Sequence, residues 1–147
     1  MNSIRRDTGM RPASTPKRGR KKGKGLPTLA SLKKKAWKVL SRFVRSQAAD
    51  YRGIAECYTC GVRAPSQWLQ AGHAIPGRTG SVLFDLEIIR PQCYRCNVAM
   101  RGQHHIFAAK LIREHGLEWW EQKERDSHRI VKWSRTDLES LIVKYSA

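Results

Sequence analysis

The sequence has few acidic residues and no long apolar run. Its 147 residues hold 12 Asp and Glu against 29 Lys and Arg, which gives a formal net charge of +17. No apolar run approaches the ~20 residues that a helix needs to cross a bilayer, so we expect no membrane-spanning segment. A chain this basic usually meets a polyanion, and nucleic acid is the first candidate, although a membrane surface would also attract it.

Cysteine is also scarce, and its placement is informative. All four cysteines lie in two C-x-x-C pairs, Cys57 with Cys60 and Cys93 with Cys96. Two disulfides or ordinary buried thiols are alternatives. However, a basic chain with no recognisable signal peptide indicates a cytoplasmic, non-secreted protein, and disulfides do not persist in that reducing environment. Four thiolates at this spacing predict one closed, tetrahedral zinc site.

The length suits one domain preceded by a tail. Residues 1–27 combine Lys and Arg with Gly, Pro, Ser and Thr, and Asp7 is the single acid among them. Such a segment cannot bury enough apolar surface to offset its ordering entropy, so we predict a disordered basic tail at 1–27 and a folded domain at 28–147. The tail's charge favours phosphate contact, with a solubilising tail or a nuclear-localisation-like run as alternatives.

Residues 28–49 combine a helical apolar period with a cationic opposite face. Apolar residues recur at three- and four-residue steps from Leu29 to Val44. The other positions carry the side chains that we expect to bind nucleic acid, Lys33, Lys34, Lys35, Lys38 and Arg42. Like charges one turn apart weaken an isolated helix, so neutralisation by phosphates explains them better than a solvated face does. Trp37 lies among them and suits either packing or stacking on a base.

The rest of the chain predicts a small α+β domain. Between the cysteine pairs, residues 67–73 and 81–89 predict two short strands, and residues 76–80 have the turn chemistry to join them. A helix is expected to begin near Asn97, followed by a helical face that ends at Gly116 and a short helix from Leu117. Ser134 is expected to cap a last helix, whose apolar stripe comprises Leu138, Leu141, Ile142 and Tyr145.

Several short motifs occur together in this region. The chain reads Cys-Tyr-Thr-Cys-Gly from Cys57, Gln-Trp at 67–68, Ala-Gly-His at 71–73, Phe-Asp at 84–85 and Pro-Gln-Cys-Tyr-Arg-Cys-Asn at 91–97. As a set, they resemble the phage NinG/Rap family of recombination endonucleases, within the wider HNH and endonuclease VII group, from about Ser31 to Tyr145. The resemblance implies a treble-clef fold, in the order zinc knuckle, β-hairpin, second knuckle and helix, with flanking helices at both ends.

The resemblance also implies an activity. A structure-specific DNA endonuclease of this kind would hydrolyse phosphodiester bonds in branched recombination intermediates such as Holliday junctions, in the host cytoplasm. A homodimer would suit the cutting of two strands. Two other readings of the residues stay open: a non-catalytic zinc-containing protein that binds DNA or RNA and assists recombination or packaging, and a translation-linked RNA-binding zinc protein.

The resemblance assigns roles to two residues. In the similar nucleases, the histidine of the Gly-His motif is the general base, and the asparagine after the second cysteine pair helps to bind a catalytic divalent metal. These roles fall on His73 and Asn97, and an oxygen-rich site of that type would select Mg²⁺ or Mn²⁺. The alternatives are a zinc ligand or a structural histidine for His73 and a helix N-cap for Asn97.

The sequence departs from the family pattern at two positions. Endonuclease VII has a metal-binding aspartate three residues before the histidine, where this chain has Gln70, and an HNH motif places an asparagine where Ile88 stands. Another acid, Asp85 or Glu87, would then bind the metal, or the site would be weak or inactive. His104, with its neighbour His105, is a further candidate ligand. The arginines expected to bind phosphate near the site are Arg78, Arg90, Arg95 and Arg101.

Overall fold

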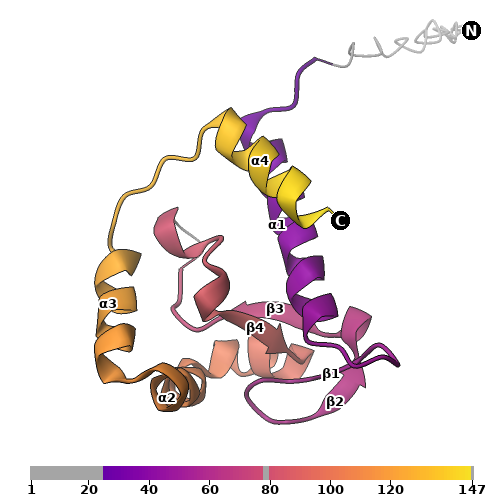
Figure 1. Ribbon diagram of the computed structural model, residues 1–147, viewed down its shortest axis with the longest axis vertical. Coiled ribbons are helices and arrows are strands. Elements are labelled where there is room, and N and C mark those ends of the chain that lie inside the picture. The colour runs from indigo at the N-terminus through magenta and orange to yellow at the C-terminus, as the bar shows by residue number, and fades with distance from the viewer. Residues whose placement is uncertain (1–24, 78–79, 147) are drawn as a thin grey trace, which may run out of the picture.

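The computed structural model describes residues 25–77 and 80–146. Two small hairpins lie at one end of the molecule, and α1 runs from them toward the other end, where α4 lies beside it (Figure 1). Most of the predicted basic tail, residues 1–24, and the predicted phosphate ligand Arg78 fall outside the described residues. The division into a tail at 1–27 and a domain at 28–147 therefore stays a prediction.

The regular elements confirm the predicted α+β class. In chain order they are α1 (Leu29–Gln47), β1 (Ile54–Glu56), β2 (Arg63–Pro65), β3 (Gln70–His73), β4 (Ile89–Gln92), α2 (His104–His115), α3 (Leu117–Ser127) and α4 (Arg135–Tyr145). Four 3-10 turns and one π-helical turn connect them, η1 (Ser66–Trp68), η2 (Gly80–Val82), η3 (Leu86–Ile88), the π-helical η4 (Arg95–Ala99) and η5 (Arg101–Gln103). None of the described helices is long and apolar enough to cross a membrane.

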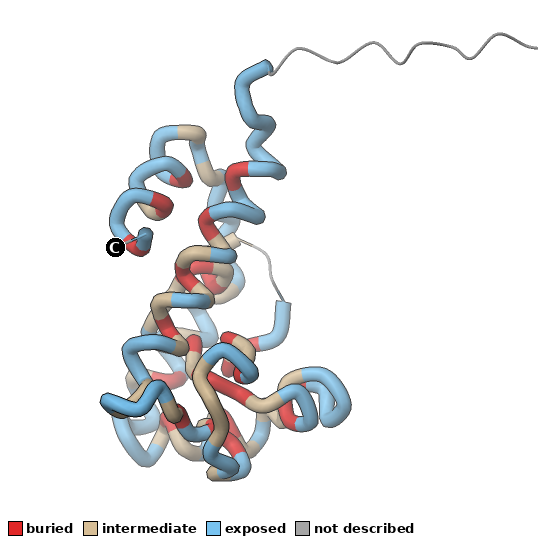
Figure 2. Tube along the Cα trace, turned by 90° about the vertical axis from the view of Figure 1, so that its right-hand side faces the viewer, coloured by how far each residue is buried: buried red, intermediate tan, exposed pale blue. Residues whose placement is uncertain are grey.

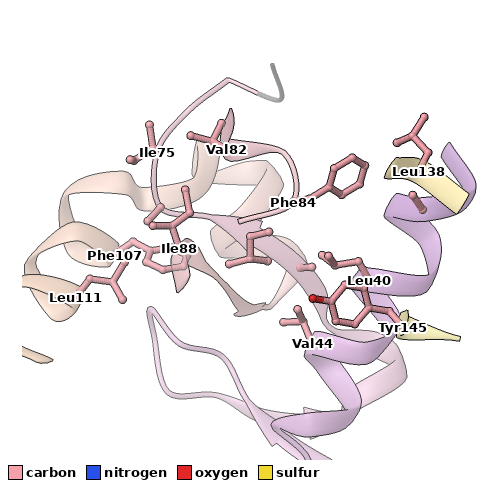
Figure 3. Packing of buried hydrophobic residues seen from close by; sticks show 14 of the residues in the cluster. Leu40, Val44, Ile75, Val82, Phe84, Ile88, Phe107, Leu111, Leu138 and Tyr145 are labelled. Atoms are coloured by element: carbon pink, nitrogen blue, oxygen red, sulfur yellow. The ribbon is translucent and has the colours of Figure 1, made fainter. Parts of the chain in front are cut away.

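Helix α1 forms where its apolar period predicts it. Thr28 caps the N-terminus, because its hydroxyl accepts a hydrogen bond from the Ser31 amide at 3.2 Å. The side chains buried along α1 recur at four-residue steps, Leu32, Ala36, Leu40 and Val44. Helix α4 covers this stripe, so that Leu40 and Val44 lie close to Tyr145 (Figure 3).

Two separate antiparallel hairpins hold the cysteine region. Strand β1 pairs with β2 next to the first cysteine pair. Strand β3 pairs with β4, which places Gln70 opposite Gln92 and His73 opposite Ile89. The predicted strand at 67–73 is therefore correct from Gln70 onward, whereas its first residues form the end of η1.

The predicted second strand at 81–89 is wrong in its position. That segment forms η2 and η3, and β4 begins only at Ile89. Asp85 provides a local reason, because its carboxylate accepts a hydrogen bond from the Glu87 amide at 3.0 Å and caps η3. The alternating apolar residues Val82, Phe84 and Ile88 are buried from turns instead of from one strand face.

The helix predicted near Asn97 is interrupted. Asn97 lies inside η4, and α2 starts at His104. Between them Arg101, Gly102 and Gln103 have φ angles of 51°, 85° and 45°, in the left-handed region that a right-handed helix excludes. The order of knuckle, hairpin, knuckle and helix is nevertheless the predicted treble-clef order.

The C-terminal helices close one apolar core. Helix α2 ends at Gly116, which has a φ of 94°, and α4 starts with the predicted capping box of Ser134 and Asp137. Phe107 and Leu111 of α2 are fully buried (Figure 3). Buried positions line the inward sides of the helices and hairpins, whereas the outer turns of α1 are largely exposed (Figure 2). The β3–β4 hairpin is thereby fixed against α1.

Candidate metal centre and adjoining cleft

The four cysteines form one compact cluster. Each Sγ atom lies within 4.8 Å of the others, and the Sγ atoms of Cys60 and Cys93 are 3.8 Å apart. Zinc–sulfur bonds of about 2.3 Å in a tetrahedron place the sulfurs about 3.8 Å from one another. Gly61, directly after the first pair, has a φ of 77°, a conformation that glycine adopts readily in a tight turn. The cluster therefore matches a structural zinc site in both ligand type and spacing.

The surroundings of the sulfurs favour a thiolate at Cys57 but not at Cys60 or Cys96. Burial raises the pKa of the Cys57 thiol, but the Cys60 amide and the Thr59 hydroxyl lower it more, to about 6. Burial raises the pKa of Cys96 to about 12, with the thiols of Cys60 and Cys93 adding to the rise. Four neighbouring thiols cannot all ionise without a positive charge between them, and a zinc ion supplies that charge.

A cleft of about 610 Å³ opens beside this cluster, between α1, strand β3 and the second knuckle. Among the residues that the sequence singles out, it brings together His73, Asn97, Gln70, His104 and Arg101. Helix α1 contributes Trp37, Ser41 and Arg45 to its wall. Among the described residues that line the cleft, there is no Asp or Glu.

Two contacts that sequence reasoning missed help to hold His73 in the cleft. Its imidazole stacks on the indole of Trp37, with ring centroids 4.8 Å apart and planes inclined by 17°. Its Nε2 atom lies 3.2 Å from the carbonyl oxygen of Leu83. A carbonyl can only accept a hydrogen bond, so Nε2 carries the proton and the lone pair of the neutral ring lies on Nδ1. That tautomer is the one a general base at Nδ1 requires.

Ile88 has a different role from the asparagine of an HNH motif. Its side chain is fully buried in the core, and its carbonyl accepts a hydrogen bond from the Ala74 amide at 2.8 Å. The Leu83 carbonyl, in the loop before Ile88, orients the His73 ring instead of a side-chain amide. The absence of asparagine at position 88 therefore leaves the histidine fixed by other groups.

Asn97 and Gln70 meet at the floor of the cleft. Asn97 Nδ2 donates a hydrogen bond to Gln70 Oε1 at 2.6 Å. Asn97 lies within η4, where its backbone N–H donates a hydrogen bond to the Cys93 carbonyl at 2.9 Å. The N-cap position of that turn is Tyr94. Gln70 thus orients the Asn97 side chain, and Asn97 is not a helix cap.

The two candidate acidic ligands of a catalytic metal, Asp85 and Glu87, lie outside the cleft that holds His73. Asp85 accepts a hydrogen bond from Lys123 Nζ at 2.9 Å, and Glu87 also pairs with Lys123. Neither acid lines the cleft. His104 does line it, with Nδ1 3.0 Å from the Ala74 carbonyl, whereas His105 is exposed outside it.

The predicted cationic residues divide into two groups. Arg90 is half-buried, donates to the Leu86 and Ile89 carbonyls at 3.0 Å, and lies over the Tyr58 ring, so its contacts are structural. The others that the structure describes are exposed, Lys33, Lys34, Lys35, Lys38, Arg42, Arg95 and Arg101. Arg101 reaches the edge of the cleft, and the lysines cover the outer face of α1.

Comparison with known proteins tests the resemblance independently of this geometry. No curated protein and no solved structure matches the chain significantly. A family model, described as the bacteriophage lambda NinG protein, matches residues 6–147. That span includes both cysteine pairs, the cleft and all the described helices. The chain therefore belongs to the NinG family of bacteriophage proteins.

Proposed function

We propose that this protein is a metal-dependent DNA endonuclease that hydrolyses phosphodiester bonds in branched recombination intermediates of the Holliday-junction type. The observation that carries this proposal is the placement of His73, whose Nε2 atom lies 3.2 Å from the Leu83 carbonyl oxygen, in the same cleft as Asn97 and beside the cysteine cluster. The branched substrate and the host cytoplasm as its location follow from the family resemblance. A homodimer would supply the second cleft that cutting two strands requires.

The residues of the chain can perform most of the reaction. His73 Nδ1 takes a proton from water, the water oxygen forms a bond to phosphorus, one P–O ester bond breaks, and the leaving oxygen takes up a proton from solvent. Trp37 and the Leu83 carbonyl fix the direction of the Nδ1 lone pair. Arg101 at the cleft edge and the lysines of α1 hold the flanking phosphates, as expected for exposed cations around a nucleic-acid site.

A catalytic cation would be held weakly by the protein itself. Among the described residues, the four cysteines are the single group of three or more His, Cys, Asp or Glu able to share an ion. Asn97 and His104 offer neutral donors, which suit a Mg²⁺ or Mn²⁺ ion that keeps its own waters and binds substrate phosphate. Such an ion would neutralise charge on the phosphoryl oxygens.

A second candidate function is a non-catalytic zinc module that binds DNA or RNA. The cleft supports it in one respect, because no described lining residue is a carboxylate and Gln70 is hydrogen-bonded to Asn97. The exposed lysines of α1 would serve either function equally.

One experiment separates the two. Zinc-loaded protein is incubated with a four-way junction, a linear duplex and a single strand, with Mg²⁺, Mn²⁺ or no added divalent ion, and products are resolved on denaturing gels. His73→Ala is the test variant, and His105→Ala is the control on the exposed neighbour of the cleft. Zinc is measured after each incubation, because its loss would stop the reaction by unfolding the protein.

The endonuclease predicts junction cleavage that needs added divalent ion, survives in His105→Ala and is lost in His73→Ala. Tight binding with no cleavage under any condition would instead establish the binding module. Cleavage that His73→Ala leaves unchanged would remove the assigned mechanism.

A further inference from the structure

Three large apolar side chains lie exposed in the second knuckle. Tyr94, Val98 and Met100 are 62%, 46% and 48% exposed. Tyr94 and Val98 are four residues apart and separated by about one turn of η4. Single exposed apolar residues are ordinary on a protein surface, but a group of them in one short segment is a candidate interaction site. We refer to these three residues as the knuckle patch.

The knuckle patch adjoins the candidate site and carries positive charge at its edges. Val98 lines the cleft together with Asn97 and Arg101. Arg95 and Arg101 are both exposed within the same segment. A surface that combines apolar side chains with arginines fits a partner that offers apolar faces between phosphates, which is nucleic acid with unstacked bases.

The knuckle patch has a rigid support. Cys93 and Cys96 attach the segment to the cysteine cluster, and the Met100 amide bonds to the Arg95 carbonyl at 2.7 Å. On the far side of the segment, the fully buried Gln92 donates a hydrogen bond to the Gly102 carbonyl at 2.9 Å. Side chains held in place in this way lose less conformational entropy when they stack on an exposed base face.

We propose that the knuckle patch recognises the base-pair faces that become exposed at a DNA branch point, and that it provides the junction preference of this protein. This inference rests on the proposed function for its DNA partner. A continuous duplex offers phosphates to the α1 lysines but keeps its base faces stacked. A branch point offers both. The lysines then provide affinity for any DNA, and Tyr94, Val98 and Met100 provide selectivity for the branch.

Binding alone tests this inference, so the experiment uses His73→Ala protein, in which no cleavage is expected. Fluorescence anisotropy gives Kd values for a four-way junction and for a duplex, both closed by hairpin loops so that neither has exposed ends. The test variant adds Tyr94→Ala, Val98→Ser and Met100→Gln. The control variant instead adds Leu117→Ser, Ile130→Ser and Val143→Ser, which are exposed apolar residues of α3, α4 and the segment between them.

The inference predicts that the parent binds the junction more tightly than the duplex. In the test variant, the ratio of the duplex Kd to the junction Kd should fall about tenfold, as expected for the loss of base stacking. Its duplex affinity and its zinc content should not change. The control variant should behave as the parent. A parent without junction preference, or a test variant that retains it, overturns the inference. Junction preference without cleavage in the unsubstituted protein would remove the proposed enzyme and leave the knuckle patch standing.

Discussion

Trp37 stacks on the imidazole that is proposed to act as the base, although it comes from a helix more than thirty residues earlier in the chain. Loss of the indole lets the His73 ring turn away from the scissile phosphate, and misplacement by about 1 Å can cost 100-fold in rate. We predict that Trp37→Ala lowers kcat for junction cleavage about 10- to 100-fold and that Trp37→Phe restores most of it. Single-turnover cleavage measures both.

The matched control for this prediction is Trp68→Ala. Trp68 is 70% exposed, so its removal should leave kcat unchanged. An equal fall in the two alanine variants would contradict a positioning role for Trp37, and so would a change confined to KM.

Gly72 is required by its contact with Gln92 across the β3–β4 hairpin. A Cβ atom at position 72 would lie 1.8 Å from Gln92 Oε1, and Gln92 is fully buried and hydrogen-bonded to Thr59 and Gly102. We predict that Gly72→Ala destabilises the protein by about 1–3 kcal/mol, the usual cost of overpacking. Urea unfolding measures this cost.

Gly25→Ala serves as the control, because a methyl group added at Gly25 would have no neighbour within 4 Å among the described residues. Adding Gln92→Ala to Gly72→Ala should relieve part of the clash, so the two substitutions should cost less together than their sum. Strict additivity would show that the contact does not determine the choice of glycine.

The lysines of α1 are expected to lower the stability of the helix and to raise its affinity for phosphates. Lys34 and Lys38 are exposed one turn apart, where like charges repel. We predict that Lys34→Gln with Lys38→Gln slightly raises the melting temperature and lowers DNA affinity. The slope of log Kd against log salt should fall by about 2, since each phosphate contact contributes about 0.9. Arg125→Gln on α3, where the side chain bonds to Gln122, should leave that slope unchanged.

Helix α4 depends on pH through its capping box. Hydrogen bonds from the Ser134 hydroxyl and amide hold the pKa of Asp137 below its usual value of 3.8. A carboxyl with a lowered pKa in the folded state contributes stability above its unfolded pKa and loses it as the pH falls through the folded pKa. We predict that Asp137→Asn is less stable than the wild type at neutral pH and that the difference shrinks below about pH 4.

Urea unfolding of the two proteins in parallel checks this, since any effect of acid on the cysteine thiolates is common to both. Ser134→Ala should raise the pKa of Asp137 toward its usual value in an NMR titration. A difference between the wild type and Asp137→Asn that is constant with pH would contradict the role of the ionised carboxylate.

The helices were predictable because their apolar periods and caps are local, as at Thr28 and Ser134. The region 81–89 was not, because its apolar alternation imitates a strand while Asp85 turns the chain into η3. In the site, cysteine spacing alone predicts the cluster. The stacking of Trp37 and the pairing of Asp85 with Lys123 join residues far apart in sequence, and no local pattern records such contacts.

The cysteine cluster joins segments that lie far apart in the sequence. It links the β1–β2 hairpin to the knuckle that carries Asn97, so we predict one zinc ion per chain and loss of the folded cleft when zinc is removed. The Cys93→Ser variant should lose the zinc. Its free energy of unfolding should fall by several kcal/mol, because a structural zinc contributes its binding free energy to folding. Elemental analysis and circular dichroism melts with and without a chelator measure both.

His104→Ala is the informative control here, since His104 lies in the cleft but outside the cluster. It should retain a full zinc content and a chelator-sensitive melt. A wild-type protein that keeps its melting temperature after complete zinc removal would refute the structural role.

The packing of α4 on α1 has a consequence for synthesis of the chain. Helix α1 emerges from the ribosome before any other described element, yet part of its apolar stripe is covered by α4, the last of them (Figure 1). Leu32 and Leu40 therefore stay exposed to solvent, or are shielded by a chaperone, until α4 has been synthesised as far as Tyr145. Ile130, between α3 and α4, is 90% exposed. A chain that is truncated or cleaved there would lack α4, would expose apolar side chains of α1 and would be prone to aggregate.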